Sequence, residues 1–107
     1  MSPGKSRKLA QIKALVATGA YHISGKVQSL LEDGCFEIED IECCLTTATA
    51  IEKWEDDELG VATDGRKYTI IGTDTQGYLF YTCGKILADR SGARLYFFIT
   101  AHEDEAG

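Results

Sequence analysis

Residues 66–103 place the strongest constraint on what this 107-residue chain can fold into. They read as three β-strands, RKYTIIGTD, GYLFYTCGKILA and RLYFFITAHE, joined by the turn sequences DTQG and DRSG. β-Branched and aromatic residues fill the runs, and Asp, Ser and Gly in the connections supply turn chemistry. We therefore predict an antiparallel meander of three strands over this stretch.

The last of these strands alternates most regularly, so its two faces can be assigned. The set expected in the core is Leu95, Phe97, Ile99 and Ala101. The set expected on the opposite face is Arg94, Tyr96, Phe98, Thr100 and His102. Aromatic, basic and hydroxyl groups together are unusual on a face that only meets water. The pattern therefore favours a surface that meets a ligand.

Helical periodicity dominates the chain before the meander. Apolar residues recur at helical spacing over residues 6–19, 22–33 and 37–45, and Gly19 and Gly34 suit helix ends. Residues 50–55 read as a further strand at an edge of the sheet, and residues 56–65 as an acidic loop. We predict one α+β domain over residues 1–107, with two to three N-terminal helices packed on one face of a four-stranded antiparallel sheet.

Charge and cysteine content restrict the classes of function. The net charge of −6 argues against a protein that holds nucleic acid by charge alone, although the bases cluster enough to form a local basic surface. The four cysteines match no zinc spacing, and we expect neither metal nor cofactor. With no export signal visible, we expect them to be reduced thiols in the cytoplasm. No signal peptide and no apolar run of roughly 20 residues is visible, which predicts no membrane association.

Four strings carry a family resemblance, in this order: YHISGKVQSLLEDGCFEIEDIECCL, AIEKWEDD, RKYTIIGTDTQGYLFY and RLYFFITAHE. Together they resemble a small bacterial domain family of unknown function, DUF family 4258, over residues 21–103. That family is similar to the RelE, BrnT and MqsR toxin-like domains. The resemblance implies a RelE-like fold, metal-independent binding or cleavage of RNA, and an antitoxin protein as partner.

The resemblance also assigns positions to individual residues. His22 stands at the family's helix-initial histidine, and Lys26 stands where arginine is common. Arg66 opens a strand, and Thr100 belongs to the closing motif, in which His102 replaces a more usual tyrosine.

Metal-independent RNA cleavage needs proton transfer and stabilisation of the phosphate, which are chemistries of histidine and of arginine or lysine. Aromatic side chains can stack the bases. The predicted catalytic residues are His22, Arg66 and His102. The predicted substrate-binding residues are Lys26, Lys85, Tyr81, Arg94, Tyr96 and Thr100. Each of these residues also has an ordinary structural role, as a helix cap, a strand former or a surface charge beside a turn.

A second interpretation stays open from the sequence. The chain would keep the fold without the chemistry and act as a non-catalytic interaction module. Its partner would be another protein, bound through the sheet edge at residues 50–55, or a second copy in a homodimer.

Overall fold

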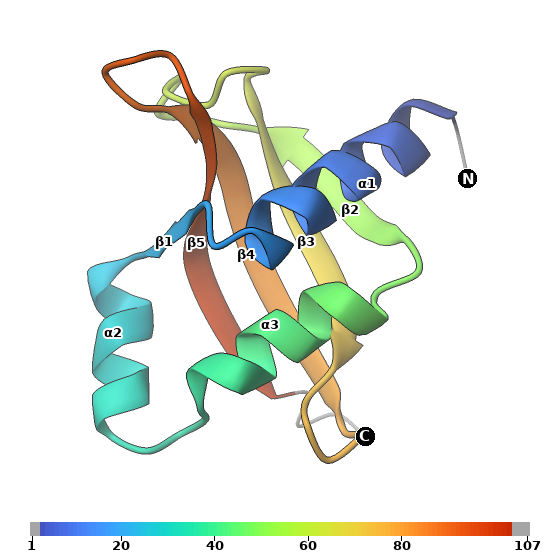
Figure 1. Ribbon diagram of the computed structural model, residues 1–107, viewed down its shortest axis with the longest axis vertical. Helices are drawn as coiled ribbons and strands as arrows, with labels where there is room; N and C mark the ends of the chain where they lie inside the picture. Colours follow the sequence, from blue (N-terminus) through green and yellow to red (C-terminus); the bar gives the residue numbers. More distant parts are fainter. Residues whose placement is uncertain (1–2, 104–107) are drawn as a thin grey trace.

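The computed structural model describes residues 3–103 and confirms the α+β class (Figure 1). It contains three helices and a five-stranded sheet. In chain order the elements are α1 (Pro3–Ala17), β1 (Tyr21–Ile23), α2 (Gly25–Glu32), α3 (Ile38–Thr47), β2 (Ile51–Asp56), β3 (Arg66–Thr73), β4 (Leu79–Ala88) and β5 (Arg94–Glu103).

The sheet has the strand order β1-β5-β4-β3-β2 and is mixed. The prediction of four antiparallel strands is wrong in this detail, because β1 adds a fifth strand that runs parallel to β5. His22 therefore lies in a strand, opposite Phe97, and not at the start of a helix. The helix begins only after Ser24, whose hydroxyl accepts a hydrogen bond from the Val27 backbone N–H at 3.2 Å. Ser24 thus acts as the N-cap of α2.

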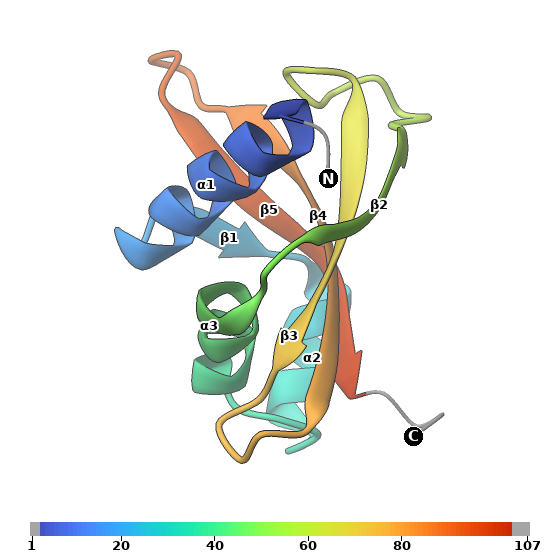
Figure 2. The same ribbon diagram turned by 90° about the vertical axis from the view of Figure 1, so that its right-hand side faces the viewer.

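The helices cover one face of the sheet, as predicted. Figure 2 shows α1 and α3 on the same side of the strands, and α2 contributes the fully buried Val27 to the same core. The largest fully buried side chains include Tyr68, Tyr96, Phe80 and Phe98. Among residues 3–103, no helix has both the length and the apolar character that crossing a membrane requires.

A β-bulge in β5 reverses half of the predicted face assignment. Cys83 of β4 pairs with Thr100, but its neighbour Gly84 pairs with Phe98, so Ile99 is the extra residue. Before the bulge, Tyr96 and Phe98 point into the core, where both have 0% exposure. Their assignment to the open face was wrong. After the bulge, Ala101 is buried while His102 is exposed, as predicted.

The first long strand occupies the predicted edge position. Among the described strands, β2 ends the sheet and pairs with β3 alone, and its register places Trp54 opposite Tyr68. The Trp54 ring packs against Tyr68 at a centroid distance of 6.1 Å, on the helix side of the sheet. Trp54 thereby anchors the edge strand to the core.

Candidate functional site

The face of the sheet that points away from the helices, called the outer face here, carries a mixed set of side chains. Its members come from alternate positions of the strands and include His22, Lys53, Glu55, Lys67, Thr69, Ile71, Leu79, Tyr81, Cys83, Leu87, Leu95, Phe97, Thr100 and His102. Most are half-buried by their neighbours, and no helix lies over them (Figure 2). Such a face resembles the stacking platforms of single-strand-binding domains more than an enclosed catalytic cleft.

Tyr81 and His102 lie on the outer face near the end of β5. They are direct cross-strand partners on β4 and β5, and their rings stack at a centroid distance of 5.2 Å and an interplanar angle of 16°. The His102 Nδ1 lies 3.0 Å from the Glu103 carbonyl oxygen, to which it donates a hydrogen bond in the tautomer that carries the proton on Nδ1. Nδ1 is thus occupied locally, and Nε2 is the nitrogen left to meet a ligand.

The bulge is what brings His102 to this face. Without the extra residue Ile99, the alternation set by Tyr96 and Phe98 would turn His102 into the core. Thr100 and Cys83 form the next cross-strand pair along the same face. Because of this one bulge, β5 places Tyr96 and Phe98 in the core and His102 on the outer face.

Lys85 also belongs to the outer face by its register, opposite Phe97, but it is not free to meet a phosphate. Its ammonium nitrogen lies 3.2 Å from Oδ1 of Asp57, and the side chains are 6% and 1% exposed. Asp57 comes from the loop between β2 and β3, which folds back over β4. Asp57 was missed from the sequence because it sits in an acidic run that looks solvated.

Arg66 lies on the helix side of the sheet. Its guanidinium carbon is 4.0 Å from the centroid of the Trp54 ring, a cation–π geometry. In the sheet, β1 and β3 are separated by β5 and β4. Strands lie about 4.8 Å apart, so His22 and Arg66 are roughly 14 Å apart across the sheet and point to opposite faces. The structure does not bring these two predicted catalytic residues together.

The remaining predicted residues are spread over the molecule. Lys26 is exposed in the first turn of α2, and Arg94 is exposed at the start of β5, where it donates to the Gly92 carbonyl at 3.0 Å. Tyr96 is fully buried, so it cannot stack on a base from solvent. The structure groups Tyr81, Thr100 and His102 on one face, with His22 at its edge.

Charge varies from element to element on the helix side, where α1 carries four bases, Lys5, Arg7, Lys8 and Lys13, and no acid. The segment from α2 to α3 carries one lysine, Lys26, and the acids Glu32, Asp33, Glu37, Glu39, Asp40 and Glu42. On the outer face, Lys53, Lys67 and Lys85 face only Glu55 and the loop residue Asp57. The acidic balance of the chain therefore does not extend to the outer face.

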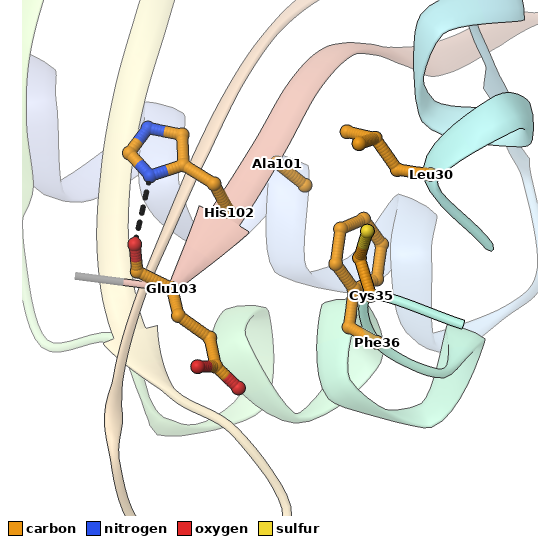
Figure 3. Close-up of a pocket in the computed structure, with 6 residues that line it drawn as sticks. All are labelled: Leu30, Cys35, Phe36, Ala101, His102 and Glu103. Carbon is orange, nitrogen blue, oxygen red and sulfur yellow. Dashed lines mark hydrogen bonds between the residues drawn. The ribbon is translucent and has the colours of Figure 1, made fainter. Parts of the chain in front are cut away.

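A pocket of about 200 Å³ lies beside the C-terminal half of β5 (Figure 3). Its lining comes from α2, from the α2–α3 connection and from β5, and comprises Leu30, Cys35, Phe36, Ala101, His102 and Glu103. Between residues 3 and 103, no group of three or more His, Cys, Asp or Glu side chains is placed to hold a metal ion.

Comparison of the chain with models of known protein families, with curated proteins and with solved structures finds no match.

Proposed function

We propose that this chain is a toxin-like domain of the RelE kind that binds single-stranded RNA on the outer face of its sheet. The observation that carries the proposal is the stacked pair of Tyr81 and His102, which presents an aromatic surface on two neighbouring strands. Bases stack on such surfaces with a gain of about 1–3 kcal/mol each, whatever their sequence. Phe97 and Thr100 continue the surface along β5.

The charge distribution supports RNA as the ligand. On the outer face, Lys53 and Lys67 lie level with Cys83 and Lys85 of β4, two and four residues along the strand from Tyr81. The acids of α2 and α3 lie on the helix side, together with the bases of α1. Because the local lysines are few, the proposed affinity depends more on stacking than on neutralising phosphates. The fall of affinity with salt should then be shallow.

The proposal concerns binding first, because cleavage needs further groups. His102 is the candidate for proton transfer beside a bound strand. The cations that were expected to stabilise the phosphate have other contacts: Lys85 with Asp57, and Arg66 with Trp54.

The test measures binding of a fluorescently labelled single-stranded RNA by anisotropy. Tyr81→Ala and His102→Ala should each weaken binding roughly tenfold, the loss of one stacking contact. The controls are Arg7→Ala and Arg66→Ala, which remove positive charge on the helix side and should leave the affinity nearly unchanged. Equal losses in all four variants would show that the outer face is not the specific binding surface and would contradict the proposal.

Induced expression in a bacterial host provides the second readout. The unaltered chain should arrest growth, and Tyr81→Ala should relieve the arrest while Arg66→Ala should not. Normal growth together with no measurable RNA affinity would favour the second candidate, a non-catalytic protein-interaction module. The observation behind that candidate is an apolar part of the outer face. Leu79, which is 51% exposed, lies at the start of β4 on the same face as Ile71 and Phe97.

A further inference from the structure

The edge of β2 that points away from β3 is open to another extended chain. Among the described strands, β2 pairs with β3 alone, and it lies at the margin of the sheet (Figure 2). Each residue from Glu52 to Asp56 is exposed or half-buried, and the side chains of Lys53 and Glu55 are 62% and 48% exposed. α1 approaches this strand from the helix side, where Lys5 lies over the Trp54 ring at 5.2 Å.

The register with β3 decides which backbone groups face this edge. The backbone N–H of Asp57 donates to the Gly65 carbonyl at 2.8 Å, and the same register continues unbroken back along β2 to Lys53. Hydrogen-bonded and non-hydrogen-bonded pairs alternate along an antiparallel ladder. Lys53 and Glu55 therefore direct their backbone N–H and C=O groups to β3, whereas Trp54 directs its own to the open edge.

The charges beside Trp54 select a second copy of this chain as the partner. In an antiparallel pair with a two-fold axis at Trp54, Lys53 of each copy lies opposite Glu55 of the other. Sliding one copy by two residues places Lys53 opposite Lys53, or Glu55 opposite Glu55, depending on the direction. Charged side chains commonly keep sheet edges apart. Here their order disfavours the neighbouring registers and favours a single one, since opposite charges attract across a strand pair and like charges repel.

Trp54 and Arg66 lie where this axis would pass. The Arg66 guanidinium carbon is 4.0 Å from the Trp54 ring centroid, and binding energy at protein interfaces is concentrated in tryptophan, tyrosine and arginine. The bulge between Ile51 and Lys53 ends the regular pairing, so the shared ladder is short. A short ladder buries little surface and predicts a weak, concentration-dependent dimer.

We propose that two copies of this chain join antiparallel along β2, with Trp54 at the two-fold axis and Lys53 of each copy paired with Glu55 of the other. The two Trp54 residues exchange main-chain hydrogen bonds across the axis. The product is one continuous sheet of ten strands, five from each copy, with both outer faces on the same side. The dimer does not rest on RNA binding, because β4 and β5, which carry Tyr81 and His102, lie away from the shared edge.

Sedimentation velocity of the full chain, up to millimolar concentration, measures the dimer. Lys53→Glu and Glu55→Lys should each weaken dimerisation at least tenfold, because each places like charges opposite one another. An equal mixture of these two variants should regain the affinity of the unaltered chain, because every charge then meets its opposite. The controls are Lys26→Glu and Glu39→Lys, on exposed positions of α2 and α3, which should leave the affinity unchanged alone or mixed.

Amide hydrogen exchange tests the register itself. The N–H of Trp54 should exchange more slowly as the protein concentration rises, because it is bonded only in the dimer. The N–H of Glu55, which is bonded to β3, should be protected equally at all concentrations. A monomer at millimolar concentration, a mixture of the two charge variants that does not recover, or Trp54 exchange independent of concentration would each overturn the proposal.

Discussion

The ammonium nitrogen of Lys85 lies 3.2 Å from Oδ1 of Asp57, and both side chains are almost inaccessible to water. Asp57 also accepts hydrogen bonds from the backbone N–H groups of Leu59, Val61 and Ala62 at 3.3, 2.9 and 2.9 Å. The backbone N–H of Ala62 is the main cause that holds the pKa of Asp57 below its usual range, and Lys85 adds to it. One carboxylate thus organises the loop between β2 and β3 and ties it to β4.

Removing the cation of this pair should destabilise the fold strongly. Lys85→Met leaves the Asp57 carboxylate buried without its counter-charge, and we expect the melting temperature to fall by roughly 10 °C or more. The matched control is Lys53→Met, because Lys53 and Glu55 form an exposed pair at 4.0 Å and such pairs contribute little. Thermal unfolding followed by circular dichroism measures both. A similar melting temperature for the two variants would contradict this view of the ion pair.

The contribution of Asp57 should also depend on pH. Because its pKa is lower in the folded state, Asp57 stabilises the protein above its unfolded pKa of about 3.9, and this contribution is lost as the pH falls through the folded pKa. The gap in unfolding free energy between the unaltered chain and Asp57→Asn should therefore be full at neutral pH and shrink below about pH 4. Urea titrations across this pH range test it, and a constant gap would refute it.

Gly72 should not tolerate even a methyl group. A Cβ at this position would lie 2.0 Å from the Cys44 carbonyl oxygen, so α3 would have to move away from β3. Gly72→Ala should destabilise the protein by several kcal/mol, on the order of other overpacked core substitutions. Gly25→Ala is the control, since a Cβ there meets nothing within 4 Å. Gly25→Ala should be neutral or stabilising by about 0.5–1 kcal/mol in urea unfolding.

Loss of the hydroxyl should change the free energy of unfolding differently at two buried tyrosines, Tyr96 and Tyr68. Within residues 3–103, the Tyr96 hydroxyl is the buried side-chain polar atom that lacks a hydrogen-bond partner, whereas the Tyr68 hydroxyl donates to Asp64. Tyr96→Phe should be neutral or slightly stabilising, and Tyr68→Phe should cost about 1–3 kcal/mol. Chemical unfolding of both variants provides the comparison. A larger loss in Tyr96→Phe would mean that its hydroxyl is satisfied in solution.

The thiols should differ in reactivity with Ellman's reagent. Cys35 is exposed, whereas Cys44 is fully buried and burial raises the pKa of its thiol to about 11. Cys35 should react at once, and Cys44 on the order of 100-fold more slowly until denaturant is added. Cys35→Ser should remove the fast phase and Cys44→Ser should not. Fast modification of Cys44 in the native protein would show that α3 opens readily.

Most elements of the fold could be predicted because their causes are local. The meander over residues 66–103, the helices near residues 6–19 and 37–45, and the edge strand all follow from periodicity and turn chemistry. β1 could not be predicted in this way. It has three residues, and it is a strand only because it pairs with Tyr96 to Phe98, far away in the chain.

The sequence by itself determined that Ala101 and His102 lie on opposite faces of the last strand, because alternation along a strand is a local property. Only the tertiary structure decided which of the predicted site residues share a surface. Because of the bulge at Ile99, Tyr96 points into the core and His102 points to the outer face. The strand order separates His22 from Arg66. The ion pair with Asp57 makes Lys85 inaccessible to a ligand. The physical reason is that register, strand order and charge pairing are set by contacts between distant segments, which no local pattern encodes.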